Sequence, residues 1–464
     1  MIILIPPNDH MEVFVKRKIC RITVCLIMLC FLLTGINAEA APLGKRIVLE
    51  NGIVLLLSER HTIPSVTINM LIKAGQVAEP SDKAGLAQIA AGLLTEGTKK
   101  RSSSQIAEEI EFVGGGIGAS GGDDSASVNL TVLKKDLDLG LDILSDILIN
   151  PIFPEEEIKR KVKETKAAIE KEKDDPSAIA GKEFARLLFG EHPYGRPTEG
   201  TPESLDKITR EDIVKFHATY YAPNNAIMAV VGDVTEEEIV SRLNKYLSGW
   251  IPRELPNRIL PIVKPPKHKI VKPMDKKITQ ANIILGHIGL ERENPDYYAV
   301  YVMNYILGGG GFTSRLMDNI RDTKGLAYDV HSYFSPMKYS GSFNIGVQTK
   351  NESAKTAIEE ALKEMERIRK ETVSDKELED AKAYLTGSFP LRLDTNSKIS
   401  GMLTAFEFYS LGLDYPDRYP KIINALTKND ILKAARKYLN LDSYILVVVG
   451  DIEKAGIKGL PAMP

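Results

Sequence analysis

One segment of the chain occurs twice, and this repeat limits the possible folds more than any other feature. Residues 208–234 and 426–452 align without a gap at a constant offset of 218 residues, with ten of 27 positions identical. Each copy has a threonine before an amphipathic stretch, followed by an apolar run that stops at Gly-Asp, at positions 232–233 and 450–451. The pattern predicts a Thr-capped helix and a buried strand, built once in each half of the chain.

The remaining hydrophobic pattern alternates strands with helices in both halves. In the first half it predicts strands at 53–57, 66–72 and 125–132 and helices at 84–94, 137–148 and 155–171. In the second half it predicts strands at 281–285, 328–334 and 341–347 and helices at 297–306, 354–369 and 375–386. The short gaps favour an α+β fold of two similar domains, each a mainly antiparallel sheet with helices packed on one face.

Prolines separate the two halves. The segment 250–273 carries Pro252, Pro256, Pro261, Pro265, Pro266 and Pro273, a composition that resists helices and central strands. Because proline-rich chain extends by about 3 Å per residue, we expect a stiff linker that joins the domains into a clamshell. The expected boundaries are an N-terminal domain at 41–248, a linker at 249–273 and a C-terminal domain at 274–464.

The first 40 residues have the pattern of a secretory signal peptide. A basic stretch precedes the apolar run Ile22 to Gly35, and Ala38-Glu39-Ala40 supplies a small-x-small cleavage pattern. Fourteen apolar residues fall short of the roughly 20 that cross a bilayer as a helix, so we expect cleavage and no permanent membrane anchor. The protein is then exported, to the periplasm or beyond, and translation starts at Met1 or Met11.

Cysteine usage and charge exclude several functions. Cys20, Cys25 and Cys30 all lie in the predicted signal peptide, so the mature chain has no disulfide, cysteine-ligated zinc or cysteine nucleophile. The 60 Lys and Arg against 62 Asp and Glu leave a net charge of -2. No basic field attracts a nucleic acid, and we expect none as a partner.

Two glycine-rich stretches stand out. The run VGGGIGASGGDD begins at Val113. Its small side chains would leave the backbone of an edge strand open to pair with a peptide, but because glycine weakens a strand we expect a mobile loop there and only loose pairing. The second run, Gly308 to Gly311, is not a phosphate loop because no G-x-x-x-x-G-K-[ST] pattern follows. It either lets the backbone approach a bound peptide or forms a flexible turn.

Long stretches of both halves carry a family resemblance. The segments GEHPYGRPTEGTPESLDKITREDIVKFHATYY, from Gly190, and LGGGGFTSRLMDNIRDTKGLAYDVHS, from Leu307, resemble the pitrilysin and mitochondrial processing peptidase family, the inverzincins. The resemblance implies a subunit of two similar halves, which pairs with a second such subunit to enclose peptides or unfolded polypeptides. Active members bind zinc through His-x-x-Glu-His on a helix, where the Glu activates water.

In this chain the corresponding run is GLAQIAAGLLTEGT, Gly85 to Thr98. Gln88 and Gly92 stand at the two histidine positions, and Ala91 stands at the catalytic Glu position. The resemblance places the third ligand near Ala167 or Ala168. Neither a neutral amide nor a methyl group is a good zinc ligand, so we expect no catalytic residue and no metal in this chain. Zinc is expected in the partner subunit.

The resemblance also implies that the second half contacts substrate. Arg321 and Tyr328 match the Arg and Tyr that family members present to the peptide, and Gly309 and Gly310 lie in the preceding glycine turn. A guanidinium and a phenol can donate hydrogen bonds to a peptide carbonyl. The alternative is that Arg321 caps a helix end and that Tyr328 is an ordinary aromatic at the start of a strand.

Three functions are compatible with the sequence. The first is a non-catalytic subunit of an exported zinc-peptidase heterodimer. In this interpretation the partner subunit carries an intact His-x-x-Glu-His, and this chain uses Arg321 and Tyr328 to bind substrate. The second is a stand-alone peptide-binding or scaffold protein of the cell envelope. The third is an autonomous metallopeptidase with a relocated site.

Overall fold

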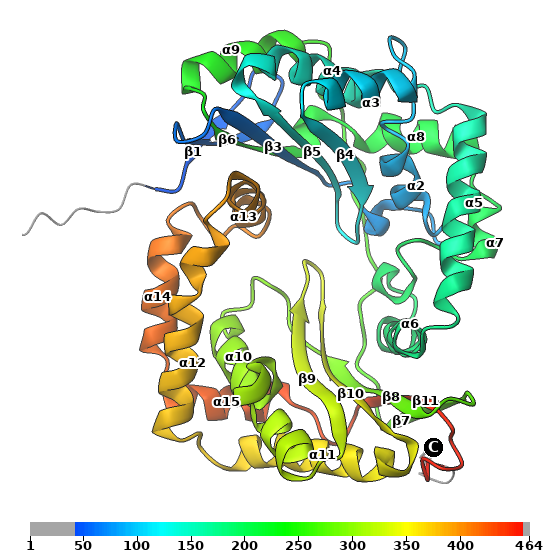
Figure 1. The fold of residues 1–464 in the computed structure, drawn as a ribbon, viewed down its shortest axis with the longest axis vertical. Helices are drawn as coiled ribbons and strands as arrows, with labels where there is room; N and C mark the ends of the chain where they lie inside the picture. Colours follow the sequence, from blue (N-terminus) through cyan, green and yellow to red (C-terminus); the bar gives the residue numbers. More distant parts are fainter. Residues whose placement is uncertain (1–41, 458–464) are drawn as a thin grey trace, which may run out of the picture. The chain divides into compact units, whose positions relative to one another are not determined.

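Two β-sheets with matching strand order organise the computed structural model, which describes residues 42–457 (Figure 1). The predicted signal peptide and its three cysteines lie outside the described residues. The first sheet has, in spatial order, β1 (Lys45–Val48), β2 (Val54–Glu59), β6 (Ala226–Gly232), β3 (Ser65–Ile72), β5 (Ala126–Leu133) and β4 (Gly116–Gly121). The second has β7 (Ile270–Asp275), β11 (Ile445–Gly450), β8 (Gln280–Ile288), β10 (Gly341–Lys350) and β9 (Ala327–Pro336).

The two sheets repeat one pairing scheme. In the described strands, β2 pairs with β6 and β7 pairs with β11 in parallel, and all other pairs are antiparallel. Thus β6 and β11, the strands of the sequence repeat, occupy equivalent positions. The α+β fold with two similar, mainly antiparallel sheets is confirmed.

Helices fill the intervals between the strands. The first half contains α2 (Leu86–Gly92), α3 (Ser103–Phe112), α4 (Leu137–Ile149), α5 (Glu155–Glu172), α6 (Pro176–Phe189), α7 (Pro202–Leu205), α8 (Arg210–Tyr220) and α9 (Glu236–Tyr246). The second half contains α10 (Tyr297–Asn304), α11 (Ala354–Lys370), α12 (Asp375–Gly387), α13 (Asn396–Phe408), α14 (Tyr415–Ala425) and α15 (Lys428–Tyr438). Among the described residues, no helix is both long enough and apolar enough to cross a membrane.

The repeated helix is capped in the same way twice. Thr209 precedes α8 and Thr427 precedes α15, and each threonine accepts a hydrogen bond from the backbone N–H three residues later. Asp212 and Asp430 bond back to the backbone N–H of the capping threonine, completing a capping box in each half. The predicted Thr-capped helix followed by a buried strand is therefore present in both halves.

In each half, the helices of that half cover one face of its sheet. One helix from the other half packs on the opposite face. α13, from the second half, packs on β3 and β6, whereas α6, from the first half, packs on β8 and β11 (Figure 1). The side chains of Ile227, Ala229 and Val231 share a cluster with Leu403 and Phe406 of α13. In the second sheet, Ile445, Val447 and Val449 share a cluster with Phe184 and Leu188 of α6.

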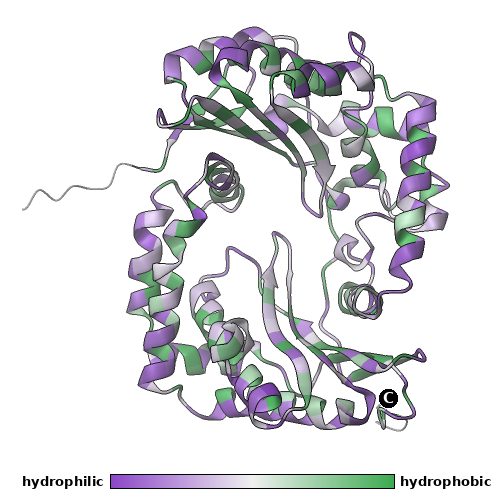
Figure 2. Cartoon of the chain, viewed as in Figure 1, coloured by the Kyte–Doolittle hydropathy of each residue, from purple (hydrophilic) through white to green (hydrophobic). Residues whose placement is uncertain are grey.

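This exchange explains why both repeated strands are entirely apolar. Every residue of β6 and of β11 is buried, because helices cover both faces of each strand. In β6, Met228 and Val230 alternate with the residues that face α13, and they pack in the core beneath the helices of their own half. Figure 2 shows the hydrophobic residues on the strands and the inner helix faces, whereas the long helix α5 is mostly hydrophilic.

The proline-rich segment has neither helix nor strand from Ile251 to His268. It is anchored at its start by the buried Trp250, whose indole N–H donates to the Tyr221 carbonyl over 3.0 Å. The Arg258 guanidinium lies 4.2 Å from the ring centre of Tyr220. β7 begins at Ile270, inside the segment predicted as linker, and Pro273 is tolerated there because β7 is an edge strand.

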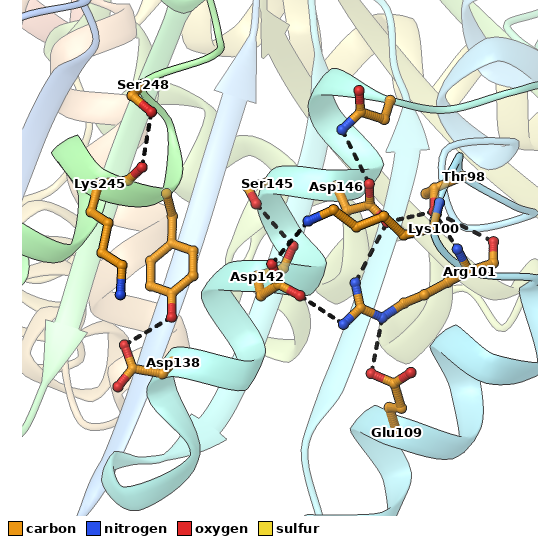
Figure 3. Close-up of polar contacts among 12 residues, drawn as sticks. Thr98, Lys100, Arg101, Glu109, Asp138, Asp142, Ser145, Asp146, Lys245 and Ser248 are labelled. Carbon is orange, nitrogen blue, oxygen red and sulfur yellow. Dashed lines mark hydrogen bonds and ion pairs between the residues drawn. The ribbon is translucent and has the colours of Figure 1, made fainter.

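A polar network ties α4 to α3 and to the loop that follows α2 (Figure 3). The buried Asp146 carboxylate accepts hydrogen bonds from Thr98 Oγ1 (2.5 Å) and Asn150 Nδ2 (3.2 Å). Arg101 Nη1 lies 3.5 Å from the same carboxylate, and the guanidinium also binds Asp142 and Glu109. One arginine thus joins three acidic side chains from two helices.

Candidate functional site

The helix α2 carries Gln88, Ala91 and Gly92, the residues at the degenerate zinc positions. Gly85 precedes it with a φ of 95°, a left-handed conformation suited to glycine, and has no side chain to cap the helix. The buried Glu79 carboxylate replaces the cap by accepting the N–H groups of Gly85 (3.3 Å) and Ala87 (2.9 Å). Burial raises the pKa of Glu79 to about 7 in spite of these bonds.

The side chains on α2 do not fit a zinc ion. Ala91 is fully buried in the core beneath the first sheet. A Cβ on Gly92 would lie 2.8 Å from Lys161 Cε and 3.4 Å from Lys161 Nζ, so a side chain there would have to displace the flexible end of this lysine. The Lys161 ammonium would also repel a cation, and Gln88 offers only a neutral amide.

The region of the expected third zinc ligand also lacks side chains that are free to bind a metal ion. Ala167 and Ala168 lie exposed on α5. The neighbouring carboxylates are engaged elsewhere, Glu164 with Arg160 (2.7 Å) and Glu170 with Lys173 (2.6 Å). Across residues 42–457, no group of three or more His, Cys, Asp or Glu side chains is arranged to hold a metal ion.

The glycine-rich run beside α2 is a strand, so the expectation of a mobile loop is wrong. Residues 116–121 form β4, which pairs with β5 and leaves its other edge free among the described strands. A Cβ on Gly121 would lie 2.7 Å from the Cα of Gln88, so glycine lets the strand approach α2 closely. Packing against a helix outweighs the low strand propensity of the run.

Arg321 and Tyr328 lie together in the second half. Arg321 belongs to a π-helical turn, Met317–Thr323, and Tyr328 is the second residue of β9. The guanidinium carbon lies 5.3 Å from the Tyr328 ring centre and 4.9 Å from that of Phe312. Both aromatic side chains are exposed, at 72% for Tyr328 and 67% for Phe312.

This Arg321 cluster, formed by Phe312, Arg321 and Tyr328, presents hydrogen-bond donors at the surface. The ring faces orient the guanidinium, and its only ion pair, among the described residues, is a long contact of 3.9 Å to Asp322. Its N–H groups and the Tyr328 hydroxyl therefore remain available to carbonyl or carboxylate oxygens. Sequence reasoning did not identify Phe312, although its position directly after the glycine run was visible.

The glycine run itself is tightly packed. A Cβ on Gly308 would lie 2.5 Å from Ser332 Oγ of β9, and a Cβ on Gly310 would lie 2.8 Å from the Tyr305 carbonyl oxygen. Gly309 is exposed and borders the amide of Asn304. Gly308, Gly309 and Gly310 thus all lie close to neighbouring atoms, although Gly309 is exposed. No hydrogen bond, ion pair or ring contact among the described residues joins the Arg321 cluster to the zinc-position residues of α2.

Comparison with known proteins gives matches over both halves. Residues 54–202 match the family described as Insulinase (Peptidase family M16), and residues 207–385 match the one described as Peptidase M16 inactive domain. The uncharacterized zinc protease YmxG of Bacillus subtilis is 28% identical over 77% of this chain and 86% of its own length. The non-peptidase homolog YmxG of Helicobacter pylori is 27% identical over 88% and 93%.

Solved structures agree with these matches. A peptidase M16 inactive domain from Pseudomonas fluorescens superposes with a TM-score of 0.83 and 29% identity, covering 88% of this chain and 98% of the other. A Helicobacter pylori protease, at 20% identity and a TM-score of 0.82, shares the fold over 88% and 99% of the two chains. Together with the repeated sheets and the helix at the zinc-motif position, these matches show that the chain belongs to peptidase family M16.

Proposed function

We propose that this protein is a non-catalytic subunit of an exported zinc-peptidase heterodimer. A partner subunit with an intact His-x-x-Glu-His supplies the zinc, and this chain supplies part of the peptide-enclosing surface together with Arg321 and Tyr328. The proposal rests on one contrast: α2 has side chains that do not fit zinc, whereas the Arg321 cluster presents exposed and available donors.

The Arg321 cluster is suited to a peptide backbone. A guanidinium offers five N–H donors in a fixed plane, and the flanking rings hold that plane while shielding one part of it from water. Hydrogen-bond donors that are already held in place before the substrate binds need little reorganisation when negative charge develops on a carbonyl oxygen. In this proposal Arg321 and Tyr328 bind and orient the peptide, and Phe312 adds an apolar contact for a neighbouring side chain.

The names of the relatives are consistent with a family in which catalysis is not universal. One relative is called a non-peptidase homolog and another a zinc protease. Export of this chain is part of the proposal and rests on the basic, apolar and small-x-small pattern of residues 1–40. N-terminal sequencing of the protein from fractionated cells tests it, and retention of the first 40 residues on a cytosolic protein contradicts it.

The catalytic part is tested by co-expression with a family M16 partner that has an intact zinc motif. We expect Arg321→Ala and Tyr328→Phe to lower kcat/KM for peptide cleavage by the pair about 10-fold to 100-fold. Tyr333→Phe is the matched control, because Tyr333 is exposed on the same strand. Turnover that is unchanged in both variants excludes the proposed role.

Two further outcomes select the other functions. Stoichiometric zinc in the purified single chain, with chelator-sensitive cleavage, would establish an autonomous peptidase. A stable homodimer that binds peptide and does not associate with any zinc-bearing relative would establish a stand-alone binding protein.

A further inference from the structure

A pocket of about 400 Å³ lies on the face of the second sheet that α6 partly covers (Figure 1). Its wall includes the start of α6, and its floor is formed mainly by alternate residues of β8, β10 and β9. The volume lies within the range of small-molecule sites. Neither the zinc-position residues of α2 nor the Arg321 cluster is among the described residues that line it.

The strand register brings the polar side chains of the floor together. Gln348 of β10 lies opposite Asn282 of β8 on one side and Asp329 of β9 on the other. Two residues earlier on β10, Gly346 lies opposite His331 and faces the same side of the sheet. Because β8 and β10 are paired along both edges, their backbone groups are taken up by the sheet. A ligand here meets side chains, which favours a compact molecule over an extended chain.

His331 presents one ring nitrogen to the pocket. Its Nδ1 lies 2.7 Å from an Asp329 carboxylate oxygen, which fixes the neutral ring in the tautomer with hydrogen on Nδ1. The ring lies over Gly346, where a Cβ would be 2.5 Å from Nε2. Nε2 forms no hydrogen bond with any described residue, so it is available as an acceptor.

Two carboxamides of the floor are also available. The half-buried side chains of Asn282 and Asn344 form no hydrogen bond with any described residue. In contrast, the other asparagines on described strands, Asn69 and Asn129, bond each other over 2.8 Å. Each amide can both donate and accept. A ligand that replaces the water on these groups gains affinity only if it restores their hydrogen bonds.

The charges around the pocket favour a neutral ligand. None of the described residues that line it is Lys or Arg. Of its two carboxylates, Asp329 is paired with His331, and Asp175 accepts the N–H groups of Ser177 (2.8 Å) and Ala178 (3.2 Å) at the start of α6. An anion would meet both carboxylates, and a cation would meet the positive end of α6. The fitting ligand is therefore neutral, with several groups that both donate and accept.

We propose that this pocket binds a sugar ring, either as a free sugar or as the terminal residue of a glycan. Each hydroxyl of a sugar both donates and accepts, so neighbouring hydroxyls can bond the Asn282 and Asn344 amides while another donates to His331 Nε2. The apolar C–H face of the ring packs on Pro176 and Ala180 of α6. This inference is independent of the proposed function, since it needs neither a peptide nor a zinc-bearing partner.

The test measures binding to the isolated full chain by saturation-transfer difference NMR. The probes are glucose, galactose and N-acetylglucosamine, together with the disaccharides cellobiose, lactose and chitobiose, which end in the same three sugars. We expect at least one monosaccharide to bind with a Kd in the millimolar range. Tighter binding of its disaccharide identifies a glycan as the source, and equal or weaker binding identifies a free sugar.

Variants and competitors separate this site from non-specific binding. Asn282→Ala and His331→Ala should each raise the Kd about tenfold, because each removes one hydrogen-bonding group from the floor. Asn129→Ala, which removes an asparagine from a strand of the first sheet, should leave the Kd unchanged. Propionamide and agmatine are the neutral-amide and cationic competitors. The proposal is overturned if no sugar binds the native chain, if either competitor binds more tightly than every sugar, or if both pocket variants are folded and keep the native Kd.

Discussion

Single glycines determine how closely the elements around α2 approach each other. Gly121 lets β4 lie against the Gln88 backbone, and Gly92 makes room for Lys161. Neither role was predictable from the sequence, because a glycine-rich run weakens a strand in isolation and the contacting residues are tens of positions away. In contrast, the residue types at 88, 91 and 92 were visible in the sequence itself, and the structure adds that a larger residue at 92 would have to displace the end of the Lys161 side chain.

Replacing Gly121 tests this close approach. Gly121→Ala places a Cβ within 2.8 Å of the Ala87 and Gln88 backbone, so we expect a loss of about 1–3 kcal/mol in the free energy of unfolding, measured by urea denaturation. Gly118→Ala, on the same strand, meets no atom within 4 Å and should cost less than about 0.5 kcal/mol. Equal costs for the two variants would mean that β4 does not pack on α2 as described.

Helix ends differ in how much of their capping is local. The threonine caps of α8 and α15 act within four residues of sequence, so the repeat predicted both caps, and the structure adds the aspartates that complete each capping box. The cap of α2 comes from Glu79, six residues before Gly85, across a turn that no local pattern indicates. The Arg101 network was likewise hidden, because Asp142 and Asp146 lie on a separate helix and are distant from Arg101 in sequence.

The Arg101 network gives a prediction at the level of elements. Arg101→Met leaves the buried Asp146 carboxylate without a cation and should cost about 3 kcal/mol in the free energy of unfolding. Lys100→Met removes an exposed pair with Asp142 (3.2 Å) and should cost less than about 1 kcal/mol. Chemical denaturation of both variants checks the difference, and a small cost for Arg101→Met would place the stabilisation in the Thr98 and Asn150 hydrogen bonds instead.

At the scale of the whole molecule, the two halves are held together by α6 and α13, each of which packs on the sheet of the other half. The sequence indicated that β6 and β11 are buried strands, since both are uninterrupted apolar runs, and it indicated the α+β class correctly. It did not indicate what covers their second faces. An amphipathic helix shows which of its sides is apolar but not which sheet it meets, and here each of the two helices meets the sheet of the other half.

Each half also contains a buried neutral histidine that makes stability depend on pH. Burial lowers the pKa of His217 and of His287 to about 4. His217 Nε2 donates to the Leu148 carbonyl (3.0 Å), and His287 Nε2 accepts the Asn440 N–H (3.0 Å). Because the folded pKa lies below the unfolded value, the stability linked to each neutral ring is complete above pH 6.5 and is lost as the pH falls toward 4.

Substitution isolates this effect from other titrating groups. We expect the stability advantage of the native chain over His217→Gln to shrink by about 3 kcal/mol between pH 7 and pH 4, measured by urea denaturation. The same holds for His287→Gln. Ile213→Val, a buried and non-titrating change on α8, should cost about 1 kcal/mol at both pH values. An advantage over His217→Gln that is constant with pH would show that His217 does not titrate as described.

The exchange of α6 and α13 makes each half of the chain depend on the other. A half expressed alone would leave one face of its central strand bare and one helix without a sheet to cover, and the other half supplies what each needs. Because the proline-rich segment joins the halves in one chain, this mutual covering takes place at a high effective concentration and does not depend on the concentration of the protein.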